Sequence, residues 1–226
     1  MPQPEPGGDA EPKETMSQHE IENANLFMMC THARKDAMAE LPGGYHFRRI
    51  LPGELELWKR MHFDDEATAN AYSGYMTEWF ARVYAQRVGE FFERCIFACD
   101  RADIPVGTCF LWNAYSAIPT VHWFKVLKAH EGKGIGRALL SAVMKSADYP
   151  VFLHTQPGSY RAIKLYSDFG FSLLLDPVIG SRKNDIAIAL PYLRDHLLQP
   201  EFEKLSFSHA PEAFLRLVSQ HSEAEF

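Results

Sequence analysis

Three glycines separate an apolar run from a helical pattern near the middle of the chain. The run Thr120–Leu127 has the length and the content of β-branched and aromatic residues that favour a buried strand. After Gly132, Gly134 and Gly136, apolar residues recur at helical spacing on one face of residues 139–144. Glycines let a backbone approach a ligand closely, and the first turn of a helix presents unpaired N–H groups and a partial positive charge. The stretch therefore predicts a phosphate-binding site.

The residue order within this turn distinguishes between kinds of phosphate site. The dinucleotide fingerprint G-x-G-x-x-G fails in both registers, because Arg137 and Leu139 stand where its third glycine is required. The mononucleotide P-loop requires Ser or Thr after its lysine, but Lys133 is followed by Gly134. Residues Glu131–Gly136 instead resemble the pattern Q/R-x-x-G-x-G/A of the GNAT superfamily of acyl-CoA N-acyltransferases, with an acidic residue in the first position.

A second stretch carries the same resemblance. Residues 159–171 are similar to the superfamily's second signature, N-x-x-A-I-x-L-Y-x-x-x-G-F, with Ser159 in place of the Asn. The matching positions are Ala162, Ile163, Leu165, Tyr166, Gly170 and Phe171. The two motifs also occur in the superfamily's order. The resemblance is specific over residues 120–175 and extends at the level of the fold over residues 45–190.

The resemblance implies both a fold and a reaction. The expected fold is α/β, with a mixed, mostly antiparallel, twisted sheet of six to seven strands and helices on both faces. The expected reaction transfers an acetyl group from acetyl-CoA, a co-substrate, to a primary amine. The transfer would occur directly, in a ternary complex of enzyme, acetyl-CoA and a small-molecule or peptide amine.

The resemblance also implies where the coenzyme binds. Pantetheine would lie along the central strand and pair with backbone groups of Phe124, Lys125 and Val126. The pyrophosphate would accept hydrogen bonds from backbone N–H groups of Gly132, Lys133, Gly134, Ile135, Gly136 and Arg137. The Lys133 and Arg137 side chains either add positive charge there or lie solvated on the surface. Ser159 would replace the Asn that bonds pantetheine, and Glu131 would repel the pyrophosphate unless its side chain points away.

Tyr166 and His154 are the expected catalytic residues. Tyr166 occupies the superfamily's tyrosine position, where it would protonate the departing thiolate; the alternative is a core tyrosine. His154 lies on the strand Val151–Thr155 and could accept the amine proton, or it is a histidine held within the sheet. His122 is a rival base, and the acidic loop Asp64–Glu66 is a third candidate or a solvated helix start.

Composition restricts the remaining function classes. The 226 residues are 46% hydrophobic and 23% charged, as in globular proteins. A net charge of −6 argues against a nucleic-acid partner and mildly favours a cationic acceptor. No apolar run is long enough for a membrane span, and the beginning of the chain lacks a signal pattern. The four cysteines form no C-x-x-C pair and the ten histidines show no metal spacing, so we expect buried thiols, no metal and a cytoplasmic monomer or homodimer.

The chain is expected to divide into four parts. Residues 1–16 are a disordered tail, 17–44 an N-terminal extension, 45–192 the acyltransferase domain and 193–226 a C-terminal helical extension. Strands are expected at Tyr45–Leu51, Cys95–Asp100, Val106–Trp112, Thr120–Leu127, Val151–Thr155, Phe171–Leu175 and Asp185–Leu190. Further helices are expected over residues 72–92 and Pro211–Ser219, while Leu26–Met29 fits either a strand or the middle of a helix.

Two other functions remain open from the sequence. A CoA-binding sensor or interaction domain without catalysis would explain the departures at Glu131 and Ser159, and it would bind the coenzyme without turning over any amine. An unrelated nucleotide-phosphate binder would bind ATP and not CoA.

Overall fold

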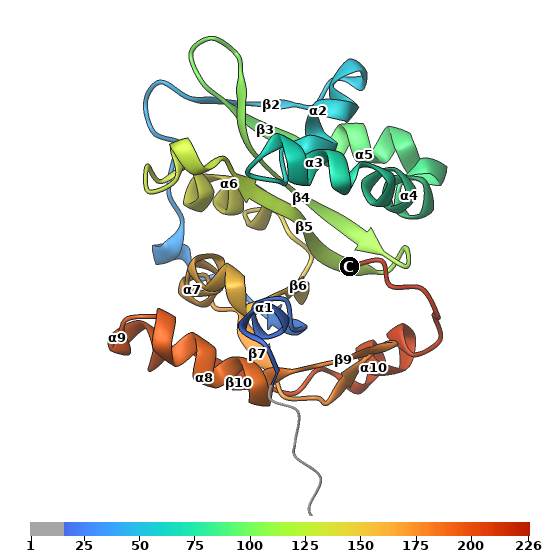
Figure 1. Ribbon diagram of the computed structural model, residues 1–226, viewed down its shortest axis with the longest axis vertical. Coiled ribbons are helices and arrows are strands. Elements are labelled where there is room, and N and C mark those ends of the chain that lie inside the picture. Colours follow the sequence, from blue (N-terminus) through green and yellow to red (C-terminus); the bar gives the residue numbers. More distant parts are fainter. Residues whose placement is uncertain (1–15) are drawn as a thin grey trace, which may run out of the picture.

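The computed structural model describes residues 16–226, so the tail expected over residues 1–16 lies outside the described residues except for Met16. An eight-stranded mixed sheet runs through the molecule in the order β10-β7-β1-β6-β5-β4-β3-β2 (Figure 1). Its strands are β1 Leu26–Cys30, β2 His46–Arg49, β3 Ile96–Cys99, β4 Pro105–Ala114, β5 Ile118–Val126, β6 Val151–Thr155, β7 Ser172–Leu174 and β10 Ser206–Ser208. A separate two-stranded ribbon pairs β8 Val178–Ile179 with β9 Arg182–Lys183.

The expected mixed, mostly antiparallel sheet is confirmed. Neighbouring strands are antiparallel except at β5–β6 and β7–β10, which are parallel. The sheet has more strands than the six to seven expected, because β1 and β10 join it. β1 comes from the segment that fitted either a strand or a helix, and it lies between β6 and β7. Segments from near both ends of the chain, β1 and β10, therefore join the strands of the central part in one sheet.

Helices cover both faces of the sheet, as expected. The α-helices are α1 Gln18–Glu22, α2 Leu55–Arg60, α3 Glu66–Ala71, α4 Ser73–Val83, α5 Val88–Arg94, α6 Ile135–Met144, α7 Tyr160–Asp168, α8 Ile186–His196, α9 Gln199–Phe202 and α10 Glu212–Val218. Short 3₁₀ turns occur at η1 Lys35–Ala37, η2 Pro52–Glu54, η3 Ala85–Arg87, η4 Lys128–His130 and η5 Pro157–Ser159. Among the described residues, none of these helices is both long and apolar enough to cross a lipid bilayer.

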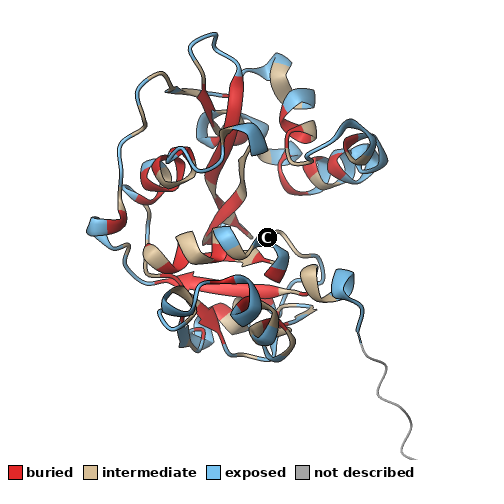
Figure 2. Cartoon of the chain, turned by 60° about the vertical axis from the view of Figure 1, so that its left-hand side comes forward, coloured by how far each residue is buried: buried red, intermediate tan, exposed pale blue. Residues whose placement is uncertain are grey.

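Two apolar clusters form the core, one on each face of the sheet. Helices α2, α4, α5 and α10 pack on one face, where Trp58, Tyr84 and Phe91 are fully buried. Helices α6, α7 and α8 pack on the other, where Leu139 and Phe169 are fully buried. Figure 2 shows the buried residues concentrated along the strands and on the sides of the helices that face them. Burying each such side chain contributes roughly 1.5–3 kcal/mol, so both helix layers stabilise the sheet between them.

Strands β5 and β6 separate within the sheet. Their parallel ladder has the register Thr120↔Phe152, and the described pairing goes no further along either strand. On its other side β5 stays paired with β4 as far as Val126, with an irregularity opposite Thr108–Phe110. At this irregularity Trp123 has a φ of +49°, which is unusual for a residue with a side chain. The second half of β5 therefore presents its edge to an opening and not to a neighbouring strand.

The continuous helix expected over residues 72–92 is wrong, because the chain breaks after Val83. Residues 85–87 form a 3₁₀ turn, and α5 starts in a new direction at Val88. The break allows Tyr84 and Phe91 to pack on one ring, Trp58, with centroids 6.0 and 5.0 Å away. Aromatic residues at helical spacing indicated the two helices correctly but not the turn between them.

The strand expected at Asp185–Leu190 is also wrong, because these residues begin α8. Alternating Ile and Ala over residues 186–189 fits a strand, but Ala189, Leu193 and Leu197 are buried at four-residue spacing. The start of the helix is attached to β1, since the Asp185 N–H donates to the Asn25 carbonyl at 2.9 Å. The helix continues through Pro191, so the expected boundary at residues 192–193 falls inside α8.

All four cysteines are reduced and buried. Cys30 and Cys109 face the cluster that contains α6 and α7, and Cys95 and Cys99 face the other cluster. Burial raises the pKa of the Cys95 thiol to about 12 and that of the Cys99 thiol to about 11. Thiols with such pKa values pack as small apolar side chains and are poor nucleophiles at neutral pH.

Candidate active site

The opening between β5 and β6 contains two adjoining cavities. The larger, about 810 Å³, is a groove along the second half of β5, the glycine turn and the start of α7. The smaller, about 280 Å³, lies between β5, β6 and α7. Phe124, Ser159 and Ala162 line both cavities, so the groove leads into the smaller cavity at these residues.

The structure brings most of the expected coenzyme residues together along the groove. These are Phe124, Lys125, Val126, Gly132, Gly134, Gly136, Arg137 and Ser159. Ile135 does not line the groove with its side chain, which is buried against the core beneath α6. Lys133 is also absent from the lining, and its Nζ donates to the Ala129 carbonyl at 2.9 Å.

The glycine turn has the geometry of an anion-binding site. Gly132 and Gly134 have φ values of +73° and +85°, which favour glycine over residues with a side chain. The first backbone bond of α6 runs from the Ala138 N–H to the Gly134 carbonyl at 3.1 Å. In the part of the chain that the structure describes, the N–H groups of residues 132–137 donate to no protein acceptor. They are therefore available to a ligand at the positive end of the helix dipole.

Gly136 serves packing and not backbone conformation. A Cβ at this position would lie 3.0 Å from Phe124 Cζ and 3.5 Å from Val126 Cγ2. The start of α6 therefore sits against the same β5 residues that line the groove. This close approach fixes the glycine turn relative to the free edge of β5.

Arginine side chains near the turn are already paired within the protein. Glu131, the acidic departure from the family pattern, forms an ion pair with Arg161 of α7 at 3.1 Å. The Arg137 guanidinium binds the Asp168 carboxylate at 2.5 Å and the Ala37 carbonyl at 3.0 Å. Arg161 thus offsets the acidic residue, and the Arg137 side chain joins α6 to α7.

Tyr166 lines the smaller cavity from α7. Its ring lies 5.8 Å from Phe124 and 5.7 Å from Phe171, between centroids. Burial, with a smaller contribution from the Cys109 thiol, raises the pKa of the Tyr166 hydroxyl far above its ordinary value. The hydroxyl is therefore protonated at neutral pH, so Tyr166 could donate a proton to a ligand in this cavity.

His154 lines the same cavity from β6. Its Nε2 is 2.9 Å from Asn25 Oδ1, and its ring is 5.1 Å from that of Phe27, its register partner on β1. Burial, with a smaller contribution from the Arg182 charge, lowers the pKa of His154 to about 3. The imidazole is therefore neutral at neutral pH, and Asn25 holds one of its two nitrogens.

His122, the rival base, also lines this cavity, from β5. Its Nδ1 lies 2.5 Å from the Tyr84 hydroxyl, which in turn accepts a hydrogen bond from Trp123 Nε1 at 3.0 Å. His122 Nε2 is buried and has no hydrogen-bond partner within the described residues. Burial lowers the pKa of His122 to about 3, so this imidazole is neutral as well.

The acidic loop does not reach the smaller cavity. Asp64 lines the outer groove and pairs with Lys125 at 2.6 Å, and Asp65 caps α3 by accepting from the Thr68 N–H at 2.9 Å. Glu66 pairs with Arg60. The interpretation as a helix start is therefore confirmed for Asp65.

Three residues of the smaller cavity or its surroundings had no signal in the sequence. Asn25 belongs to a segment whose structure was ambiguous, and Tyr84 was one member of a long aromatic pattern. Arg182 lies in a loop region before an expected strand, and it lines the cavity from β9. Each acquires its position from long-range contacts, which local periodicity does not report.

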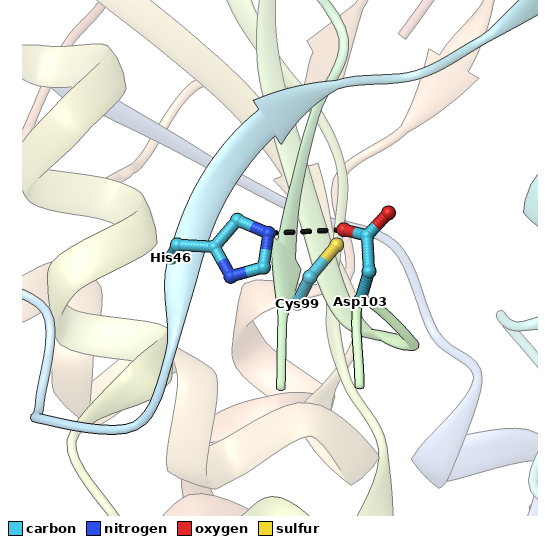
Figure 3. A group of neighbouring side chains, drawn as sticks. All are labelled: His46, Cys99 and Asp103. Atoms are coloured by element: carbon cyan, nitrogen blue, oxygen red, sulfur yellow. Dashed lines mark hydrogen bonds and ion pairs between the residues drawn. The ribbon is translucent and has the colours of Figure 1, made fainter. Parts of the chain in front are cut away.

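One group of potential metal ligands occurs among the described residues, far from both cavities in the sheet order. His46 on β2, Cys99 on β3 and Asp103 in the following turn bring their ligand atoms within 4.8 Å of one another (Figure 3). The Asp103 Oδ1 already accepts from His46 Nε2 at 2.9 Å and from Arg48 Nε at 2.8 Å. The Arg48 charge opposes a cation at this oxygen, so the group stabilises the edge of the sheet.

The parallel strands β5 and β6 separate, and β5 continues into a glycine turn and helix α6. This arrangement is the acyltransferase fold that the two sequence motifs implied. The sequence model described as the Acetyltransferase (GNAT) family matches residues 57–171, just over half of the 226 residues. The chain therefore belongs to the GNAT acetyltransferase family. Members of this family are acyltransferases that typically use acetyl-CoA and act on amines.

Solved structures that are similar to this chain include the following three. A GCN5-related N-acetyltransferase from Sphaerobacter thermophilus is 19% identical over 66% of this chain, with a TM-score of 0.49. A tandem GNAT protein from the clavulanic acid biosynthesis pathway is 14% identical over 66%, with a TM-score of 0.48. Arabidopsis thaliana Naa50, in complex with the bisubstrate analogue CoA-Ac-MVNAL, is 24% identical over 62%, with a TM-score of 0.43.

The match covers different shares of these proteins. It spans 48% and 50% of the first two and 91% of Naa50. The chain thus corresponds to about half of the length of the first two. No curated protein sequence matches this chain.

Proposed function

We propose that this protein transfers the acetyl group of acetyl-CoA to a primary amine by direct transfer in a ternary complex. The observation that carries the proposal is the opening after Thr120↔Phe152, where a groove with free backbone groups leads into a smaller cavity. The groove suits an extended pantetheine arm, and the unpaired N–H groups at the glycine turn suit a diphosphate. The acceptor amine occupies the smaller cavity.

The reaction then assigns roles to Tyr166, to His154 and to the free edge of β5. The amine nitrogen attacks the thioester carbonyl carbon, a C–N bond forms and the C–S bond breaks. Tyr166 gives its proton to the departing sulfur, and His154 takes the surplus proton of the nitrogen. A backbone N–H of the free edge at Phe124–Val126 stabilises the negative charge that develops on the carbonyl oxygen. The products are an acetamide and the free thiol of CoA.

Replacement of Tyr166 by Phe tests this proposal. The Tyr166→Phe variant is expected to bind acetyl-CoA as the wild type does, because the ring still fills its place beside Phe124. Its kcat should fall at least about 100-fold, the usual contribution of a general acid. Calorimetry measures the binding, and release of CoA thiol over a panel of amines measures kcat. Tyr192→Phe, on α8 outside both cavities, is the matched control.

Two results would contradict the proposal. If wild-type protein neither binds acetyl-CoA nor releases thiol with any amine, the assignment of the groove is wrong. If it binds acetyl-CoA but turns over no amine, the protein is a coenzyme-binding domain without catalysis. This is the alternative that the departures at Glu131 and Ser159 suggested.

A further inference from the structure

Arg182 gives the smaller cavity a positive charge. The residues that line this cavity include no Asp, Glu or Lys, and both of its histidines are neutral. Arg182 enters from β9, in the ribbon beyond β7. Its guanidinium carbon lies 4.7 Å from the centre of the Phe27 ring and 5.7 Å from that of Phe226. The charge is thus held between two aromatic faces at one wall of the cavity.

No carboxylate side chain of the described residues pairs with this charge. The neighbouring Lys183 is paired, with Asp185 at 2.8 Å. Arg182 donates through Nη2 to the main-chain oxygen of Phe226, the last residue of the sequence, and this bond uses one of its N–H groups. A guanidinium has five N–H donors in a planar fork that matches a carboxylate. Burial lowers the pKa of Arg182 to about 10, so the group is still protonated at neutral pH. A partly buried cation with spare donors favours an anionic ligand.

The charge lies outside the groove that the proposed function assigns to the coenzyme. The cavity meets the groove at Phe124, Ser159 and Ala162, and Arg182 lines the cavity but not the groove. The nearer of the two rings that Arg182 contacts is Phe27, whose register partner on β6 is His154. A ligand bound to Arg182 therefore extends past His154 toward Tyr166, with its other end at the junction.

The rest of the lining limits the size and polarity of that ligand. Aromatic rings of Tyr75, Trp79, Trp123 and Phe226 form much of the wall. The volume of about 280 Å³ is at the lower end of ligand pockets, which span roughly 300–1,000 Å³. A small molecule with an apolar body fits this space, and a polyamine would place a second cation beside Arg182.

We propose that the acceptor is a small amino carboxylate, such as an apolar α-amino acid, whose carboxylate binds Arg182 while its amine reaches the junction. The inference rests on the proposed acetyl transfer at this site and specifies its substrate class. The bonds that form and break are those of the acetyl transfer, so the products are an N-acetyl amino acid and CoA. The carboxylate takes no part in the chemistry and determines orientation and selectivity.

Kinetics with matched amines test the proposal. The twenty L-amino acids are assayed for thiol release, and the best three are compared with their carboxamides and their decarboxylated amines. Wild-type kcat/KM should favour each amino acid over its two analogues by about ten- to 100-fold, the range expected for a charge-assisted pair. In Arg182→Gln this preference should disappear, mainly through a higher KM for the amino acid. Arg182→Lys should retain part of it, and Lys183→Gln should retain all of it.

A binding measurement keeps the test independent of turnover. In the presence of CoA, calorimetry should detect the N-acetyl amino acids bound to wild type, and Arg182→Gln should weaken them without weakening their amides. A melting temperature of each variant equal to that of the wild type shows that the substitution has not unfolded the protein around the cavity.

The inference is overturned if wild type uses amides and decarboxylated amines as well as amino acids. It is also overturned if Arg182→Gln lowers activity equally on amino acids, carboxamides and decarboxylated amines. Arg182 would then only hold Phe226 in place. Absence of both acetyl-CoA binding and turnover would instead refute the acetyl transfer itself.

Discussion

At the scale of single residues, burial controls the protonation of Tyr166, His122 and His154. Tyr166 keeps its proton because its pKa is raised, and His122 and His154 are neutral because their pKa values are lowered to about 3. The two imidazoles differ in their partners. His154 is held by the Asn25 amide. His122 is held by a tyrosine hydroxyl, and its Nε2 has no partner among residues 16–226.

We expect His154→Gln to lower kcat by about 100-fold and His122→Gln to lower it less, because the Gln amide can keep the contact with Asn25 but cannot take a proton. Both imidazoles stay neutral above pH 4, so the pH–rate profile should follow ionisation of the amine substrate and show no step near pH 6.5. A larger loss in His122→Gln, measured at saturating acetyl-CoA, would assign the base to His122 and not to His154.

At the scale of elements, the site depends on the fixed distance between the start of α6 and the free edge of β5. Gly136 sets that distance, because a Cβ there would meet Phe124 Cζ at 3.0 Å. The Glu131–Arg161 pair adds a link from the turn to α7. These contacts thus join the turn, the strand edge and helix α7 around the groove.

Gly136→Ala should therefore weaken acetyl-CoA binding by about tenfold and lower the free energy of unfolding by about 1–3 kcal/mol, the usual cost of overpacking. Gly43→Ala is the matched control, since nothing lies within 4 Å of its added Cβ. Calorimetry and urea unfolding measure the two effects. Unchanged binding in Gly136→Ala would show that the coenzyme does not depend on this contact.

The elements that could be predicted from the sequence are those whose secondary structure follows from their own local residue pattern. The strand before the glycines, the helix after them and the strand Val151–Thr155 follow from local pattern and glycine chemistry. The break at Tyr84 and the start of α8 at Ile186 do not, because packing on Trp58 and contacts with Asn25 decide them. Most of the groove was predictable because its residues follow from local sequence pattern. The positions of Asn25 and Arg182 were not predictable, because long-range contacts decide them.

At the scale of the whole molecule, net charge and local charge point in opposite directions. The chain carries a net charge of −6, which favours cationic partners at long range. The smaller cavity has the reverse sign, because Arg182 is the charged side chain among the residues that line it. A ligand inside the cavity interacts most strongly with the charges nearest to it, so we give the local charge more weight for the acceptor.

Three histidines that are buried in the neutral form should make the fold sensitive to mild acid. The pKa values of His62, His122 and His154 are lowered by burial from 6.5 to about 3. The unfolded chain therefore binds protons below pH 6.5 that the folded chain does not, and stability is present above pH 6.5 and lost as the pH falls toward 3. Each histidine should cost up to about 1.4 kcal/mol per pH unit in this window.

Urea unfolding at pH 7.5, 6.5 and 5.5 measures this loss. His62→Gln, outside both cavities, should remove about a third of the slope if the three histidines contribute equally. An identical slope in wild type and His62→Gln would contradict the buried neutral state of His62.

The placement of the cysteines has a practical consequence for colorimetric assays. Aromatic disulfide reagents titrate accessible sulfhydryls, and Cys30, Cys95, Cys99 and Cys109 are shielded inside the folded chain. Colour that develops with such a reagent should report liberated coenzyme with a flat background from the catalyst itself. A slow rise in that background would report global unfolding, so the same reagent also measures the rate of denaturation.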